Sequence, residues 1–129
     1  MSSSAGVVRG RLLLIDDEPA IANLIQRSLQ RSWDVTCFLS AVPALDILAT
    51  REFDAIVCDL MMPVMDGMQF ADELARRHPA LRLRTLFLTG GAATASAEAF
   101  LARPDVRSMS KPLSMRDLDS ALRDLAGLT

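Results

Sequence analysis

Short apolar runs alternate with longer amphipathic segments along the chain. Five such runs lie at residues 12–15, 35–38, 55–58, 86–88 and, more weakly, 106–109. The first, third and fourth runs are apolar throughout, whereas a strand with one solvent-exposed face alternates between apolar and polar residues. This pattern is typical of strands that are buried on both faces, so the sequence predicts a parallel β-sheet.

The segments between these runs carry helix signals. Asp17, Glu18 and Pro19 open the first segment with acids and a proline that suits a first helical turn. Further helices are indicated by a cap at Ser40, a capping box from Asp66 to Gln69, the Ala-rich residues 94–102, and a cap at Ser114 before Asp117. Strands that alternate with helices on right-handed crossovers predict an α/β fold with five helices covering both faces of the sheet.

The composition fits one domain. The chain has 129 residues, of which 50% are apolar, enough for one core without room for a second folded domain. Residues 1–10 show no apolar period. We therefore expect a flexible leader over residues 1–10 and a single domain over residues 11–129.

Charge and hydropathy exclude several classes of protein. The net charge is -2 and the basic residues are scattered, so direct nucleic-acid binding is not expected. Because there is no apolar run of about 18 residues and no secretory signal, we expect no membrane span and a cytoplasmic location. Cys37 and Cys58 match neither a CxxC pair nor a zinc site, and we expect both to be reduced and buried.

Polar side chains follow the apolar runs at the points where the strands end. Asp16 and Asp17 follow the first run, Asp59 the third and Thr89 the fourth, while Lys111 comes shortly after the fifth. A strand order of 2-1-3-4-5 would bring the three aspartates together at the carboxyl edge of the sheet, where such folds bind ligands. Close carboxylates require a cation, and hard oxygen ligands suit Mg²⁺. With a lysine and a hydroxyl nearby, this set indicates phosphoryl transfer.

The segment from Asp59 to Gly67, DLMMPVMDG, resembles the signature around the phosphorylated aspartate of response-regulator receiver domains. Asp16-Asp17, Thr89 and Lys111-Pro112 resemble the other fixed points of that family in order and spacing, and the resemblance covers about residues 11–126. It implies a flavodoxin-like, doubly wound sheet of five parallel strands in the order 2-1-3-4-5. It also implies a phosphoacceptor module rather than an enzyme.

The resemblance implies a role for each acidic residue. Asp59 would accept the phosphoryl group, and Asp17 and Asp59 would bind Mg²⁺ directly. Asp16 would hold the ion through water, and the backbone carbonyl of Met61 would be the third protein ligand.

The remaining site residues and the partners follow from the same resemblance. Thr89 and Lys111 would contact the phosphoryl group, and the Lys111-Pro112 bond would be cis. His78 is the only histidine, which leaves no separate phosphodonor motif in the chain. We therefore expect a histidine kinase or a histidine phosphotransfer protein as the donor, and a monomer or weak dimer.

Two features depart from the family pattern. Ser108 stands three residues before the lysine, where the family usually has a tyrosine or phenylalanine that turns inward on activation. The stretch Thr89-Gly90-Gly91-Ala92 resembles receivers appended to hybrid sensor kinases more than those fused to DNA-binding domains.

Two other functions use similar residues. A magnesium-dependent aspartyl-phosphate hydrolase generally has a second acid two residues after its nucleophile, and Met61 stands there. A flavodoxin-like cofactor binder needs an anion-binding loop after the first strand, whereas Asp16, Asp17 and Glu18 would repel a phosphate in the absence of a metal.

Overall fold

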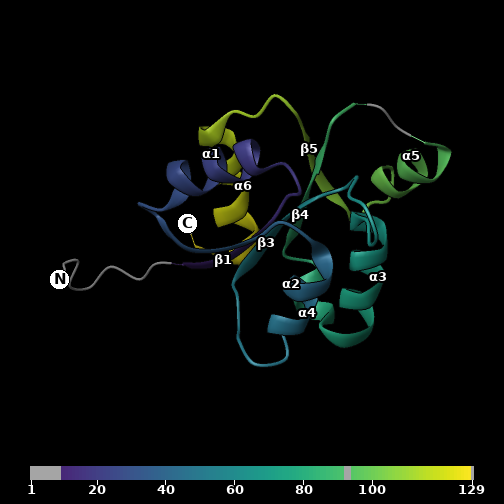
Figure 1. Cartoon of the computed structure of the whole chain (residues 1–129), viewed down its shortest axis with the longest axis horizontal. Helices are drawn as coiled ribbons and strands as arrows, with labels where there is room; N and C mark the ends of the chain where they lie inside the picture. Colours follow the sequence, from purple (N-terminus) through teal and green to yellow (C-terminus); the bar gives the residue numbers. More distant parts are fainter. Residues whose placement is uncertain (1–9, 92–93, 129) are drawn as a thin grey trace.

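The computed structural model describes residues 10–91 and 94–128 and contains one sheet with helices on both sides (Figure 1). The described strands are β1 (Gly10–Ile15), β2 (Trp33–Phe38), β3 (Ala55–Asp59), β4 (Thr85–Thr89) and β5 (Arg107–Ser110). The described helices are α1 (Pro19–Leu29), α2 (Ala41–Ile47), α3 (Gly67–Arg77), α4 (Pro79–Arg82), α5 (Ala95–Leu101) and α6 (Met115–Ala126). The strands are parallel in the order β2-β1-β3-β4-β5, as the sequence predicts.

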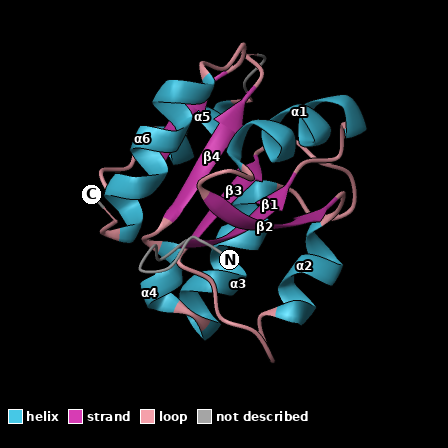
Figure 2. Cartoon of the chain, turned by 90° about the vertical axis from the view of Figure 1, so that its left-hand side faces the viewer, coloured by secondary structure: helices cyan, strands magenta, loops and turns pink. Residues whose placement is uncertain are grey.

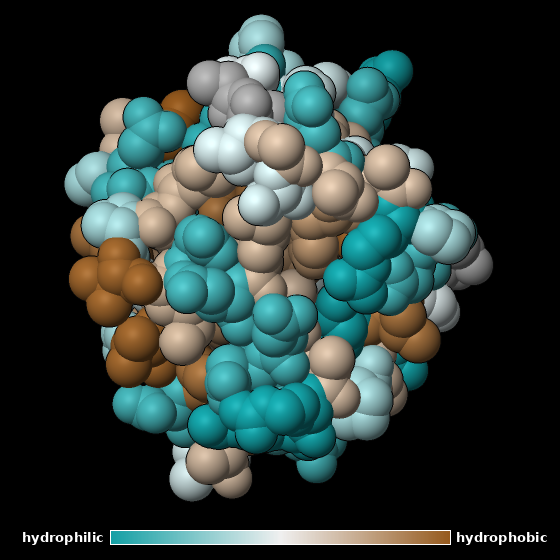
Figure 3. All heavy atoms as spheres, turned by 90° about the vertical axis from the view of Figure 1, so that its right-hand side faces the viewer, coloured by the Kyte–Doolittle hydropathy of each residue, from teal (hydrophilic) through white to brown (hydrophobic). Residues whose placement is uncertain are grey.

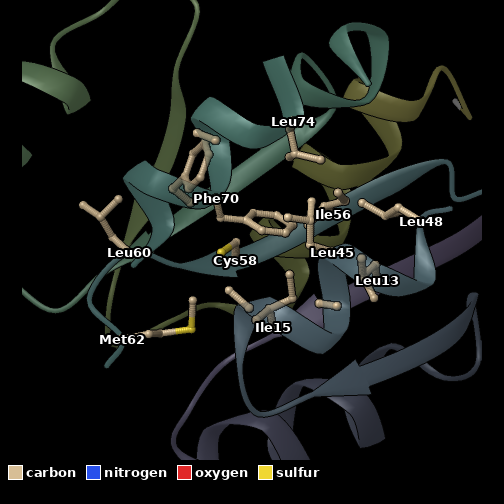
Figure 4. Packing of buried hydrophobic residues seen from close by; sticks show 14 of the residues in the cluster. Leu13, Ile15, Leu45, Leu48, Ile56, Cys58, Leu60, Met62, Phe70 and Leu74 are labelled. Carbon is tan, nitrogen blue, oxygen red and sulfur yellow. The ribbon is translucent and has the colours of Figure 1, made fainter. Parts of the chain in front are cut away.

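Each face of the sheet has its own apolar core, because successive strand residues point to opposite faces. Leu13 and Ile15 pack with buried residues of α2, α3 and α5, and this core is shown from close by in Figure 4. Leu12 and Leu14 pack with buried residues of α1 and α6. Figure 2 shows the two groups of helices on either side of the strands. Burial on both faces explains why the first, third and fourth runs are apolar throughout.

The predicted helix starts are confirmed except for one cap. Asp66 accepts a hydrogen bond from the Gln69 backbone N–H at 2.9 Å, and the Gln69 side chain accepts one from the Asp66 backbone N–H at 3.0 Å, which completes the capping box. The Ser114 hydroxyl oxygen caps α6. Ser40 lies at the N-cap position of α2, but its side chain makes no capping hydrogen bond, so that expectation was wrong.

The sequence did not predict the short helix α4 or the start of β1 at Gly10. The short helix α4 is a sixth helix, which begins at Pro79 directly after α3 ends; four residues are too few to show a helical period in the sequence. β1 begins at Gly10, inside the predicted leader, since a strand partner in β2 extends the pairing to that residue. Residues 1–9 of the predicted leader lie outside the described residues.

The two cysteines lie in different environments. Cys58 is a buried free thiol in the central strand β3, as expected. Cys37 is free but only half-buried, because β2 forms the edge of the sheet. Among the described helices, none is both long enough and apolar enough to cross a membrane.

Candidate functional site

Three carboxylates meet at the carboxyl edge of the sheet. Asp59 is the last residue of β3, and Asp16 and Asp17 follow β1, which is the neighbouring strand. One carboxylate oxygen from each of the three lies within 4.8 Å of the others. Asp16 is 0% exposed and Asp59 is 5% exposed. The convergence that the strand order predicted is therefore present, and two of its three acids are buried.

Backbone contacts hold these acids in place. The Asp16 carboxylate accepts a hydrogen bond from the Glu18 backbone N–H at 3.0 Å, which orients the carboxylate at the start of α1. The loop after Asp59 passes so close to Gly67 that a Cβ atom there would lie 2.8 Å from the Asp59 backbone oxygen and from the Leu60 Cα atom. Glycine is therefore required at position 67, and α3 starts directly beside the end of β3.

Lys111 brings a positive charge into the acidic cluster. Its ammonium nitrogen lies 3.1 Å from Glu18 Oε1, 3.3 Å from Asp16 Oδ2 and 3.5 Å from Asp59 Oδ1. The Lys111 side chain is 16% exposed. The Lys111-Pro112 bond is cis, as the family resemblance implies. The sequence predicts Lys111 at this cluster. Glu18 is expected there as an acid at the helix start that would repel a phosphate, and its contact with Lys111 was not predicted.

Burial and mutual repulsion change the acidity of this cluster. The pKa of Asp59 is raised to about 7, chiefly by burial. The negative charges of Asp16 and Asp17 also raise this pKa, whereas the positive charge of Lys111 lowers it. Burial also raises the pKa of Asp16, although the Glu18 N–H and the Lys111 charge oppose it. Burial lowers the pKa of Lys111, but its hydrogen bond to Glu18 and the nearby aspartates outweigh this effect, so the net shift is upward.

The donor set fits a hard metal ion. Asp16 Oδ2 is buried without a hydrogen-bond partner among the described residues. The Lys111 ammonium, 3.3 Å away, is the nearby positive charge that offsets the negative charge of this oxygen. One lysine does not neutralise three close carboxylates, so a divalent cation would relieve the remaining repulsion. Oxygen ligands without histidine or cysteine suit magnesium or calcium rather than zinc.

A pocket of about 260 Å³ opens over the acids and is lined by Asp17, Glu18, Asp59, Met61, Gly90 and Lys111. The predicted ligand residue Met61 thus lies at the pocket. Thr89, by contrast, lines a neighbouring hollow of about 210 Å³ that shares Met61 and Gly90 with the first. Five of the six predicted site residues therefore belong to the acidic cluster or line its pocket, whereas Thr89 lines the neighbouring hollow.

Ser108 lies in the exposed edge strand β5, paired in register with Phe87 of β4. Ser110 of the same strand is paired with Thr89. Position 108 has no ring, so the strand beside Thr89 lacks the aromatic side chain that the family usually has there.

Comparisons with known proteins agree with this geometry. Residues 12–123 match the sequence family described as the response regulator receiver domain. The chain is 31% identical to the response regulator receiver protein CpdR of Brucella abortus over 109 residues, which is 84% of this chain and 89% of CpdR. It is 32% identical to the sensor kinase CckA of the same organism over 117 residues, 88% of this chain but 12% of CckA.

Other curated relatives are longer, and the chain spans half of their length or less. Among solved structures, a CheY-like receiver domain protein from Methanospirillum hungatei superposes with a TM-score of 0.82 at 20% identity, covering 93% of this chain and 95% of that one. At that level of identity the likeness concerns the fold, and it supports the doubly wound topology described above.

Proposed function

Because the chain belongs to the response regulator receiver domain family, we propose that Asp59 is the residue that accepts a phosphoryl group. The chain is thus a receiver domain of two-component signalling, a phosphoacceptor rather than a true enzyme. The assignment of Asp59 rests on one observation. Among the three clustered carboxylates, Asp59 both lines the open pocket and lies 3.5 Å from the Lys111 ammonium.

We propose Mg²⁺ as the ion of this site, held by Asp17, Asp59 and the backbone carbonyl of Met61, with Asp16 acting through water. When bound, the ion neutralises charge on the phosphoryl oxygens during transfer. The buried Asp16 oxygen without a hydrogen-bond partner among the described residues supports this assignment.

Asp59 and Lys111 then have distinct chemical roles. A carboxylate oxygen of Asp59 attacks phosphorus while the bond from phosphorus to the donor histidine nitrogen breaks, and the released imidazole takes up a proton. Lys111 balances the negative charge of the phosphoryl oxygens, since its ammonium already faces Asp59. We propose that the Thr89 hydroxyl donates a hydrogen bond to the phosphoryl group from the adjacent hollow.

A receiver domain implies a histidine kinase partner. We propose that the direct donor is such a kinase or a histidine phosphotransfer protein. We also propose that the module covers residues 10–129, since β1 begins at Gly10, and that it is a monomer or weak dimer without direct contact to nucleic acid. We place it in the cytoplasm, where kinases find ATP. We propose that the donor binds at α1, where Leu24 is exposed, whereas Ile21 of the same helix packs against the core.

Intact-mass analysis after incubation with acetyl phosphate and Mg²⁺ tests the acceptor assignment. Wild type should gain one phosphoryl group that hydroxylamine removes, as expected of an acyl phosphate, and Asp59→Asn should gain none. Asp66→Asn is a matched control, because Asp66 is a nearby carboxylate that caps α3. Labelling of Asp59→Asn at the wild-type level would show that another residue is the acceptor.

A further inference from the structure

A second cavity lies at the amino edge of the sheet, away from the acidic pocket. Its volume is about 310 Å³, and its lining includes Phe53, shortly before β3, and Arg84, directly before β4. β3 and β4 are neighbouring parallel strands, so their starts lie at one edge of the sheet and Asp59 lies at the other. The cavity shares no lining residue with the acidic pocket, and it is therefore a separate site.

The interior of this cavity is apolar and recessed. Leu48 is 6% exposed, Phe53 is 7% exposed and Leu81 is half-buried. Sites for small molecules are built in this way, from a concave apolar surface of about 300–1,000 Å³ with a few polar groups that orient the ligand. The cavity lies at the small end of that range.

Two arginines from different segments flank the apolar interior. Arg51 follows α2 and is half-buried, whereas Arg84 lies between α4 and β4 and is exposed. Neither guanidinium makes an ion pair within residues 10–91 and 94–128, and neither does the exposed Glu52, which also lines the cavity. The two arginines and the glutamate give these three residues a net charge of +1.

Contacts within the fold hold both arginines at the cavity. The guanidinium carbon of Arg51 lies 5.3 Å from the centre of the Phe53 ring, and its Nη2 donates to the Thr36 hydroxyl at 3.3 Å. The Arg84 backbone N–H donates to the Leu81 carbonyl at 2.9 Å. Groups that are held in place before binding lose less conformational freedom when a ligand arrives.

We propose that this cavity binds a small organic monocarboxylate. The apolar body of the ligand packs against Leu48, Phe53 and Leu81. Its carboxylate accepts hydrogen bonds from Arg51 and Arg84, because the planar guanidinium matches the geometry of a carboxylate. One negative charge balances the net charge of +1, whereas a phosphate monoester carries about -1.5 to -2.

The surroundings of the cavity favour a small ligand over a protein partner. A stable protein interface buries roughly 1,200–2,000 Å² and is built around exposed apolar side chains. None of the exposed large apolar residues in the described part of the chain lines this cavity; they are Leu24, Leu39, Val42, Met61, Val64 and Leu83. Figure 3 shows that, on the face it draws, hydrophobic atoms reach the surface in separate groups with hydrophilic side chains between them.

Titration of the ¹⁵N-labelled protein with 2-naphthoate, followed by amide chemical shifts, tests the proposal. This probe has a flat apolar body and one carboxylate, and 2-naphthamide has the same shape without the charge. We expect saturable shifts within residues 48–53 and 78–84, and binding of 2-naphthamide that is weaker by about tenfold or more.

Two substitutions change the charge at the cavity in opposite directions. Arg84→Gln should weaken 2-naphthoate binding about tenfold, which corresponds to 1.4 kcal/mol. Glu52→Gln should strengthen it about threefold, since a like charge is removed. Arg116→Gln is the matched control, because Arg116 is an exposed arginine of α6, which packs on the other face of the sheet, and its affinity should equal that of wild type. Unchanged labelling by acetyl phosphate should show that all three variants are folded.

Several results would overturn the proposal. They are the absence of saturable shifts at these residues, equal affinity for 2-naphthamide, and equal affinity of Arg84→Gln, Glu52→Gln and wild type for 2-naphthoate. A dimer in sedimentation that Arg84→Gln dissociates and 2-naphthoate does not would overturn it in favour of a contact between two copies. Asp59→Asn should bind 2-naphthoate as wild type does, so this test is independent of the proposed function.

Discussion

The Lys111 ammonium lies closer to Glu18, at 3.1 Å, than to Asp16 at 3.3 Å or Asp59 at 3.5 Å. The one lysine of the site is thus shared between the two buried aspartates and an exposed glutamate at the pocket mouth. With a divalent ion bound, three aspartates (-3), Lys111 (+1) and the ion (+2) sum to zero, and Glu18 makes the pocket net negative. Glu18 therefore competes with an incoming phosphoryl group for the lysine.

Replacement of Glu18 by glutamine should speed labelling of Asp59 by acetyl phosphate. The reason is that one negative charge near the anionic donor is removed and Lys111 is released towards Asp59. A change of one unit charge at this range in solvent of high dielectric gives an increase of about threefold, which salt should reduce. Glu52→Gln, at an exposed acid in the loop before β3, is the control. An unchanged or slower rate in Glu18→Gln at low salt would contradict the competition.

Replacement of Asp17 by asparagine should separate metal binding from folding. Without Mg²⁺ the melting temperature of Asp17→Asn should be higher than that of the wild type, because the substitution decreases repulsion within the carboxylate cluster. With saturating Mg²⁺ the wild type should gain on the order of 10 °C, and the variant should gain nothing. Differential scanning fluorimetry measures both, with Asp34→Asn, at the exposed position of β2, as the control. Equal stabilisation of Asp17→Asn and wild type by Mg²⁺ would remove Asp17 from the ligand set.

The stability of the metal-free protein should depend on pH through Asp59. Burial and the neighbouring Asp16 raise its pKa from 3.8 to about 7 in the fold. Between these values the folded protein retains a proton that the unfolded chain has released. The contribution of Asp59 to stability is therefore fully present below pH 3.8 and is lost as the pH rises through about 7.

Urea unfolding of wild type and Asp59→Asn across this range measures the effect. The wild type should lose stability relative to the variant between about pH 4 and pH 8, and Mg²⁺ should abolish most of that loss. If the free energies of unfolding of the two proteins differed by the same amount at every pH in the absence of metal, the Asp59 pKa would not be raised.

Ser108 predicts a response to phosphorylation that is confined to the site. Because Ser108 is exposed on β5 and has no ring to bury, the apolar gain that could shift β5 and α6 is missing. Beryllofluoride should therefore protect the amides of Thr89 and Gly90 from hydrogen exchange, with little change in β5 or α6. Ser108→Tyr should add protection across β5 and α6. Strong protection of these two elements in the wild type would contradict the prediction.

Local sequence signals determined the elements and the chemical character of the site. The capping box at Asp66 involves residues three apart, and the apolar strand runs need only their own composition to indicate burial. The sequence predicts that Asp16, Asp17 and Asp59 lie close together, because parallel strands place their carboxyl ends at one edge of a sheet. These inferences depend on neighbours in sequence or on a rule that holds for every such sheet.

Tertiary structure alone decided the contacts between segments far apart in the chain. The Lys111–Glu18 pair joins residues 93 positions apart, and its distance depends on how the loop after β5 packs against the start of α1. The positive φ of Val64 arises because β3 and Gly67 fix both ends of a short loop, which a valine by itself would not predict. Local propensity acts over a few residues, whereas these two features are set by the packing of complete strands and helices. A sequence pattern therefore does not predict them.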